Sequence, residues 1–212
     1  MENEMAEAEQ IADRPPRRRF FRALAYLLLN LPIGVAGFSI LFALTSLGFS
    51  LAVVLIGLPL LGLTALLARS LARMERARVH TMLGTYIPAP HLVPSAGGQF
   101  RRWTAPLRDG ATWRDLLYVF LLFPLGVLQF SLVVGAWSVS VALLALPVFY
   151  HFVDDGAYRF PSESLHWVTV DTPMEALPWA ALGFVFAVLS VLLTRGLAVG
   201  HARFARALLA AR

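Results

Sequence analysis

The stretch "FRALAYLLLNLPIGVAGFS", residues 21–39, occurs a second time in altered form as "WRDLLYVFLLFPLGVLQFS", residues 113–131. The two stretches align without a gap at an offset of 92 positions. The identical pairs are Arg22/Arg114, Leu24/Leu116, Tyr26/Tyr118, Leu29/Leu121, Pro32/Pro124, Gly34/Gly126, Val35/Val127, Phe38/Phe130 and Ser39/Ser131. Each stretch opens a long apolar run, so the sequence predicts one structural unit that is built twice.

The match continues beyond these stretches, but its offset changes. Leu58-Pro59-Leu60 aligns with Leu146-Pro147-Val148 at an offset of 88, and residues 66–72 align with residues 192–198 at an offset of 126. The increase of 38 positions indicates an insertion in the second copy. The sequence therefore predicts two tandem repeats of a helical hairpin in the same orientation, as in many membrane folds.

The composition is that of a membrane protein. Apolar residues make up 58% of the chain and charged residues 15%, whereas soluble domains have about 45–50% and about 25%. Residues 23–68, 116–150 and 176–194 contain no charged residue, and a membrane-spanning helix needs only about 20 apolar residues. We therefore predict an all-α, polytopic membrane protein with four transmembrane helices.

The distribution of arginine predicts the orientation in the membrane. All 18 basic residues are arginines, and 17 of them lie before the first apolar run, between the second and third runs, or after the last run. The segment between the third and the last run carries most of the acidic residues that lie outside the N-terminal tail. Because Lys and Arg favour cytoplasmic segments, we expect a multi-pass plasma-membrane protein with both termini cytoplasmic and a small outer segment between the last two helices.

Four regions follow from these runs. Residues 1–20 are predicted to be a disordered cytoplasmic tail, and residues 21–84 to form the first hairpin, with a break at "TSLGFS", residues 45–50. Its second helix should continue past Ala68 as an amphipathic cytoplasmic extension that stops at Gly84. Residues 85–111 are a Pro/Gly-rich linker, and residues 112–212 form the second hairpin with an outer insertion at about 150–175.

Helix-start patterns bound the second hairpin. Thr112 and Asp115 have capping-box spacing, which predicts a start near Trp113. "TPME" at 172–175 provides an N-cap, a proline at the first helical position and Glu175, so the last helix should begin at Pro173 and run to about Leu197.

One apolar piece, Val139–Tyr150, is too short to span a membrane. It can extend the third helix outward, lie at the membrane interface, or re-enter the membrane. The sequence does not choose among these three arrangements.

The outer segment holds the candidate ligand-binding residues. "AYRF" and "HWVTVDT" predict a short β-hairpin around Pro161. Side chains that can bind a cation or a proton gather here. They are His151, Asp154, Asp155, His166 and Asp171, and Trp167 lies next to His166 as a further candidate. Their spacing matches no metal-site pattern, so we predict neither a metal nor a cofactor, and a solvated acidic cap is the alternative interpretation.

Two Pro-x-Gly pairs, Pro32/Gly34 and Pro124/Gly126, lie inside predicted helices at equivalent repeat positions. Each proline removes a backbone hydrogen bond and each glycine permits close helix approach. The pairs predict either a hinge or a kinked packing contact.

Basic residues recur on the predicted cytoplasmic helix extensions. They are Arg69, Arg73, Arg76 and His80 after the second run, and Arg203 and Arg206 after the last. We expect these faces to contact anionic lipid headgroups or a partner helix, unless they serve only to set the topology.

No enzyme motif is present. The sequence has no Gly-rich phosphate loop, no G-x-S-x-G and no H-E-x-x-H. The predicted crossings contain no His, Asp, Glu or Arg, residues that mark proton relays in membranes, which argues against an ion pump or a membrane protease. We expect no enzymatic activity and no nucleic-acid partner.

Several separated motifs carry a family resemblance. They are "AYLLLNLPIGVAGF", "LLYVFLLFPLGVLQF", "GLPLL", "LARSLARMERAR" and "DGATWRDLLY". With these, residues 20–209 resemble the putative sensor domain family of actinobacterial membrane proteins, a unit often found N-terminal to histidine-kinase cores. The resemblance implies a four-helix membrane sensor and transfers no catalytic residue.

The chain ends at Arg212, before a kinase core could begin. We therefore expect a sensor or accessory signalling subunit without an output domain of its own, which acts on a histidine kinase or a transcriptional regulator in trans. A homodimer in contact with membrane lipids fits this expectation. The alternatives are a small carrier or lipid-handling protein and a structural membrane scaffold.

Overall fold

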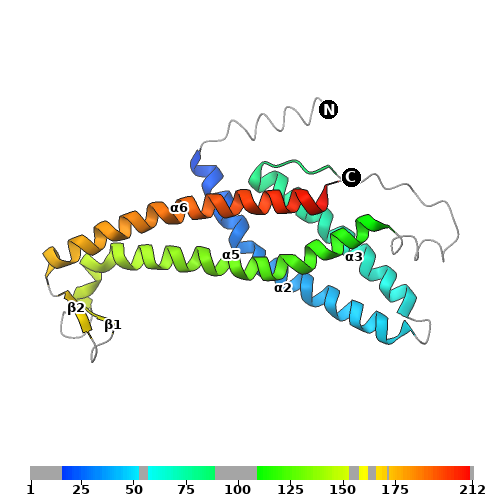
Figure 1. The fold of residues 1–212 in the computed structure, drawn as a ribbon, viewed down its shortest axis with the longest axis horizontal. Helices are drawn as coiled ribbons and strands as arrows, with labels where there is room; N and C mark the ends of the chain where they lie inside the picture. Colours follow the sequence, from blue (N-terminus) through cyan, green and yellow to red (C-terminus); the bar gives the residue numbers. More distant parts are fainter. Residues whose placement is uncertain are drawn as a thin grey trace. The chain divides into compact units, whose positions relative to one another are not determined.

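A computed structural model describes residues 16–52, 57–88, 109–152, 158–161, 166–170 and 172–210. Figure 1 shows the elements along the chain. They are helix α2 (Pro16–Ser50), helix α3 (Gly57–Arg78) with a π-helical turn at Val79–Leu83, helix α5 (Gly110–Phe149) with a 3₁₀ turn at Tyr150–Phe152, strands β1 (Tyr158–Pro161) and β2 (His166–Val170), and helix α6 (Pro173–Leu209).

Among the described residues, three helices are long and apolar enough to cross a membrane, not the four that we predicted. They are Arg18–Ser50, Gly110–Phe149 and Pro173–Leu209. Helix α3 falls short because its described part begins at Gly57 and reaches Arg69, Arg73 and Glu75 within the length that a crossing needs.

Helices α2 and α3 form a hairpin whose turn lies later than predicted. Helix α2 begins at Pro16 and runs through the predicted break to Ser50. Past Ser50, the Gly57 amide at the start of α3 donates to the Leu51 carbonyl at 3.0 Å. A Cβ atom on Gly57 would lie 2.1 Å from the Gly48 oxygen, so the turn requires glycine. At the far end, the predicted stop at Gly84 is confirmed by its left-handed φ of 69°.

The predicted start of α5 is wrong by a few residues. Helix α5 begins at Gly110, and the Asp109 carboxylate accepts the Ala111 amide at 3.0 Å. Asp109 is therefore the N-cap, and Thr112 and Asp115 do not form a capping box. The apolar piece after Val139 belongs to α5, which is helical to Phe149. Of the three arrangements that the sequence left open for Val139–Tyr150, the structure shows the extension of the third helix.

The start of α6 is confirmed, because the Thr172 hydroxyl accepts the Glu175 amide at 3.4 Å and the helix begins at Pro173. Its end is not, since α6 continues past Leu197 to Leu209. The predicted last crossing and its basic extension are thus one helix.

The predicted β-hairpin is confirmed. Strands β1 and β2 pair antiparallel, with Tyr158 opposite Val170 and Phe160 opposite Val168. Val170 packs with Leu146, Ala176 and Trp179, so the hairpin is attached to the adjoining ends of α5 and α6.

The contacts divide the chain into two compact units, which we describe separately. The hairpin unit comprises residues 131–194, and the four-helix unit comprises the described residues up to Phe130 and from Arg195 onward. Within the hairpin unit, α5 and α6 are joined by hydrogen bonds from Trp137 to Thr194 at 3.3 Å and between Ser140 and Ser190 at 3.0 Å.

In the four-helix unit, α2 and α5 cross at a reciprocal glycine contact. A Cβ atom on Gly34 would lie 3.0 Å from the Leu122 oxygen, and one on Gly126 would lie 2.7 Å from the Asn30 oxygen. Asn30 and Leu122 are related by the same offset of 92 as the two glycines. Each copy of the repeated stretch therefore makes the same backbone contact with the other.

Candidate functional site

Seven polar side chains from all four helices meet inside the four-helix unit. We call them the buried polar network: Tyr26 and Asn30 from α2, Glu75 and Arg78 from α3, Tyr118 and Gln129 from α5, and His201 from α6. Six of them are buried, and the Arg78 side chain is 13% exposed. Buried polar groups need partners, and the network supplies them internally.

The carboxylate of Glu75 is the acceptor centre of the network. It accepts a hydrogen bond from the Tyr26 hydroxyl and one from Arg78 at 2.5 Å. The Arg78 guanidinium also lies 4.7 Å from the centre of the Tyr26 ring, a cation–π distance. A buried charge is tolerated only when it is paired and hydrogen-bonded, and Glu75 meets both conditions.

Two amides extend the network from Arg78 to His201. Arg78 Nη2 donates to Asn30 Oδ1 at 3.1 Å, and Asn30 Nδ2 donates to Gln129 Oε1 at 2.9 Å. Gln129 Nε2 lies 3.0 Å from Nδ1 of His201. These amides connect α2, α5 and α6 at the level of the glycine crossing, where the Asn30 backbone contacts Gly126.

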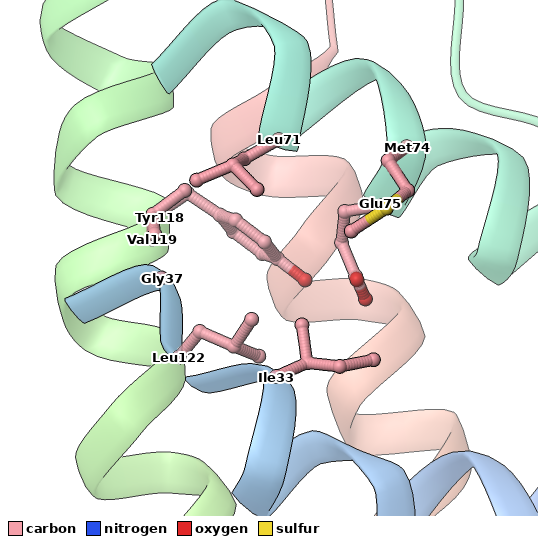
Figure 2. Close-up of a pocket in the computed structure, with 8 residues that line it drawn as sticks. All are labelled: Ile33, Gly37, Leu71, Met74, Glu75, Tyr118, Val119 and Leu122. Atoms are coloured by element: carbon pink, nitrogen blue, oxygen red, sulfur yellow. The ribbon is translucent and has the colours of Figure 1, made fainter. Parts of the chain in front are cut away.

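Tyr118 returns the network from His201 toward Glu75. Its hydroxyl lies 3.1 Å from Nε2 of His201. Figure 2 shows the same hydroxyl pointing toward the Glu75 carboxylate. Hydrogen bonds therefore connect the seven groups in one chain that includes side chains of all four helices.

A small cavity lies beside Glu75 and Tyr118 (Figure 2). Apart from these two residues its lining is nonpolar: Ile33, Gly37, Leu71, Met74, Val119 and Leu122. The cavity volume is about 10 Å³. One water molecule needs at least about 10–15 Å³.

Arginines of α3 tie together the helix ends next to the network. Arg76 binds Asp115 near the start of α5 at 2.8 Å and donates to the Leu209 carbonyl at the end of α6 at 3.1 Å. Arg69 binds Asp109 at 2.6 Å and the Thr112 hydroxyl at 2.7 Å.

A further arginine joins the start of α2 to the same group of helix ends. Arg22 donates to the Thr81 carbonyl in the π-helical turn after α3 at 3.2 Å. The start of α2, the end of α3, the start of α5 and the end of α6 therefore lie at one end of the unit.

These contacts correct part of the predicted basic faces. Arg76 is buried, with 7% of its surface exposed, and Arg69 is ion-paired and partly buried. Neither side chain is available as predicted for lipids or a partner. Arg73, Arg203 and Arg206 are exposed, and their contact with lipids or a partner stays a prediction. His80 is partly exposed, with its ring 5.9 Å from that of Tyr86.

In each Pro-x-Gly pair, the proline and the glycine lie on different faces of the helix. Gly34 and Gly126 are buried at the crossing, whereas Pro32 and Pro124 are exposed. The glycines fit the packing interpretation directly, and the hinge stays a prediction.

The candidate ligand residues of the outer segment are described only in part. His151 lies in the 3₁₀ turn, and His166 and Trp167 lie in β2. Asp154, Asp155 and Asp171 lie outside the described residues. Among the residues that the structure does describe, no group of three or more His, Cys, Asp or Glu side chains is placed to hold a metal ion.

Sequence reasoning missed the network itself. The predicted crossings contain no His, Asp, Glu or Arg, and the network is built from amides, tyrosines and charged side chains that lie beyond those predicted crossings. Asn30 and Gln129 are the only amides in the charge-free runs that include them, a signal that a search restricted to ionisable residues overlooks. His201 was missed because the last helix was predicted to end before it.

The comparisons with known proteins identify the family. The family model described as "Putative sensor" matches residues 26–209, so the chain belongs to this family, as its motifs indicated. Every residue of the buried polar network lies within the matched region. No curated protein and no solved structure matches the chain.

Proposed function

We propose that this chain is a membrane-embedded sensor domain in which the buried polar network couples a stimulus to the arginine-held helix ends. One observation carries the proposal. Glu75 is part of the network, and the next residue, Arg76, holds the last carbonyl of α6. A shift of this one turn of α3 changes both sites together.

The coupling follows from the chemistry of the two residues. Losing a hydrogen bond at Glu75 leaves a buried carboxylate under-satisfied, at a cost of about 1–3 kcal/mol. Small movements of α3 that restore hydrogen bonding displace Arg76, and with it the carbonyl at Leu209. The signal therefore leaves the unit at the end of α6.

The orientation that we propose puts these helix ends in the cytoplasm, because arginines concentrate there. The exposed side chains of Arg73, Arg203 and Arg206 are then available to anionic lipids or to a cytoplasmic partner such as a kinase or a regulator. Non-catalytic signalling of this kind fits membership of a sensor family.

Spin labels on α3 and α6 test the coupling. The chain has no cysteine, so Ala77→Cys and Val199→Cys, both exposed positions, give unique labelling sites in lipid nanodiscs. Tyr26→Phe removes only the hydroxyl that binds Glu75. We expect it to change the distance distribution between the labels by about 1–2 Å or more, as in other helix-shift transitions.

The matched control is Tyr86→Phe, because Tyr86 is exposed and outside the network; it should leave the distribution unchanged. An unchanged distribution in Tyr26→Phe would contradict the coupling and favour a scaffold. Lipid or another hydrophobic molecule that copurifies in stoichiometric amount with an unresponsive protein would favour a carrier.

A further inference from the structure

We propose that His201 is a proton-binding site and that uptake of one proton rearranges the buried polar network. This inference rests on the proposed function, because it identifies the stimulus that the network detects. Hydrogen-bond donors and acceptors surround both ring nitrogens of His201.

The surroundings of Nδ1 favour one form of the neutral ring. Gln129 Nε2 at 3.0 Å and Asn30 Nδ2 at 3.4 Å both present N–H donors to Nδ1. A neutral imidazole has one acceptor and one donor nitrogen. We therefore assign Nδ1 as the acceptor and Nε2–H as the donor to the Tyr118 hydroxyl oxygen at 3.1 Å.

A second arrangement is available at the same nitrogen. Gln129 Oε1 lies 3.2 Å from Nδ1, so the same amide offers both a donor and an acceptor. When Nδ1 takes a proton from a hydronium ion, an O–H bond breaks, an N–H bond forms, water is left, and both ring nitrogens become donors. The two N–H groups that faced Nδ1 then oppose it, and the acceptor within reach is Gln129 Oε1.

That acceptor is already in use, which links proton uptake to α3. Gln129 Oε1 accepts from Asn30, and Asn30 Oδ1 accepts from Arg78. Donation from His201 weakens the bond between Asn30 and Gln129 and so loosens the hold of Asn30 on Arg78. Arg78 is the ion-pair partner of Glu75.

The charges around the ring work in the same direction. The titratable and charged groups next to His201 are Tyr26 on α2, Arg78 on α3 and Tyr118 on α5. Glu75 lies one group further away and binds Tyr26 and Arg78. Protonated His201 and Arg78 repel one another, which adds to the displacement of Arg78.

The cavity lies close to the ring. Tyr118 lines the cavity and also binds Nε2 of His201. The cavity is therefore one hydrogen bond away from the ring.

Nitrogen-15 NMR of the histidine-labelled full chain in nanodiscs tests the site. Between about pH 8 and pH 3, a range that extends below the usual histidine transition because burial disfavours the imidazolium, we expect the ring resonance that is absent from His201→Gln to move from the neutral to the imidazolium pattern. His80→Gln is the matched control, because His80 lies outside the network, and should remove a different resonance. A His201 ring that stays neutral through this range overturns the proposal.

The spin-label pair separates this inference from the proposed function. Lowering the pH should shift the distance between positions 77 and 199 in the otherwise unaltered protein and in His80→Gln, but not in His201→Gln. If His201 titrates without a shift, the network is not rearranged by the proton and the proposal fails. If Tyr26→Phe shifts the distance and pH does not, the coupling stands and the proton is not its stimulus.

Discussion

Arg76 combines two structural roles in one side chain. Its guanidinium binds the Asp115 carboxylate and the last carbonyl of α6, and both charged side chains are at least nine-tenths buried. A cation at a helix C-terminus also interacts favourably with the helix dipole. Arg73, one turn earlier on the same helix, is exposed and bonds the Ser70 hydroxyl.

We predict that Arg76→Gln destabilises the protein by about 3 kcal/mol, since removing one partner of a buried ion pair leaves the other charge uncompensated. Arg73→Gln, a matched exposed arginine, should change the stability by less than about 0.5 kcal/mol. Unfolding by denaturant in micelles measures both values. Hydrogen exchange should accelerate in the last turn of α6 for Arg76→Gln alone, and equal effects of the two variants would contradict the assigned role.

At the level of the helices, α2 and α5 pack backbone against backbone at their crossing. Gly126 faces the backbone of Asn30 and Leu31, and Gly34 faces that of Leu122 and Phe123. Small residues of this kind let helix backbones approach in a membrane. The crossing also positions Asn30 for its bond with Gln129.

We predict that Gly126→Ala destabilises the protein by about 1–3 kcal/mol, the usual cost of overpacking. Its Cβ atom would lie 2.7 Å from the Asn30 oxygen, and that of Gly34→Ala 3.0 Å from its nearest neighbour, so Gly34→Ala should cost less. Gly135→Ala meets nothing within 4 Å and should be neutral or stabilising, because alanine is the better helix former. Thermal unfolding of the three variants tests this order.

At the scale of the whole molecule, the helix ends held by arginines define one end of the four-helix unit. Arg22, Arg69 and Arg76 each bond another helix or turn there. In the sequence, most of the other arginines lie shortly before or after these helix ends. The proposed orientation puts this end in the cytoplasm and the β-hairpin outside.

Cysteine labelling with a membrane-impermeant maleimide tests this orientation in intact cells. Phe152→Cys, at a position 80% exposed, should react from outside. Arg203→Cys, also at an exposed position, should react only after permeabilisation. The cysteine-free parent protein provides the blank, and the reverse pattern of labelling would exclude the proposed orientation.

Much of this architecture follows from local signals in the sequence. Thr172 with Pro173 marked the start of α6, Gly84 marked the end of the α3 helix, and β-branched residues marked the β-hairpin. Each signal acts within a few residues, so a sequence shows it directly.

The candidate site depends on long-range packing, and therefore most of it could not be predicted. Thr112 and Asp115 matched a local cap, yet they bind arginines about 40 positions earlier. Asn30 and His201 are 171 positions apart and meet only because four helices pack together. Periodicity placed Arg76 on a polar face but could not show that its partners lie on α5 and α6.

The reciprocal glycine crossing also bears on the ancestry of the chain. Tyr26 and Tyr118 occupy equivalent places in the two copies and both belong to the network, but Asn30 is matched by Leu122, and Gln129 by Gly37. A gene duplication would pass on the crossing and the tyrosines to both copies, whereas the paired amides require later divergence. On this account the glycine crossing and the two tyrosines are older than the duplication, and the paired amides of the network are younger.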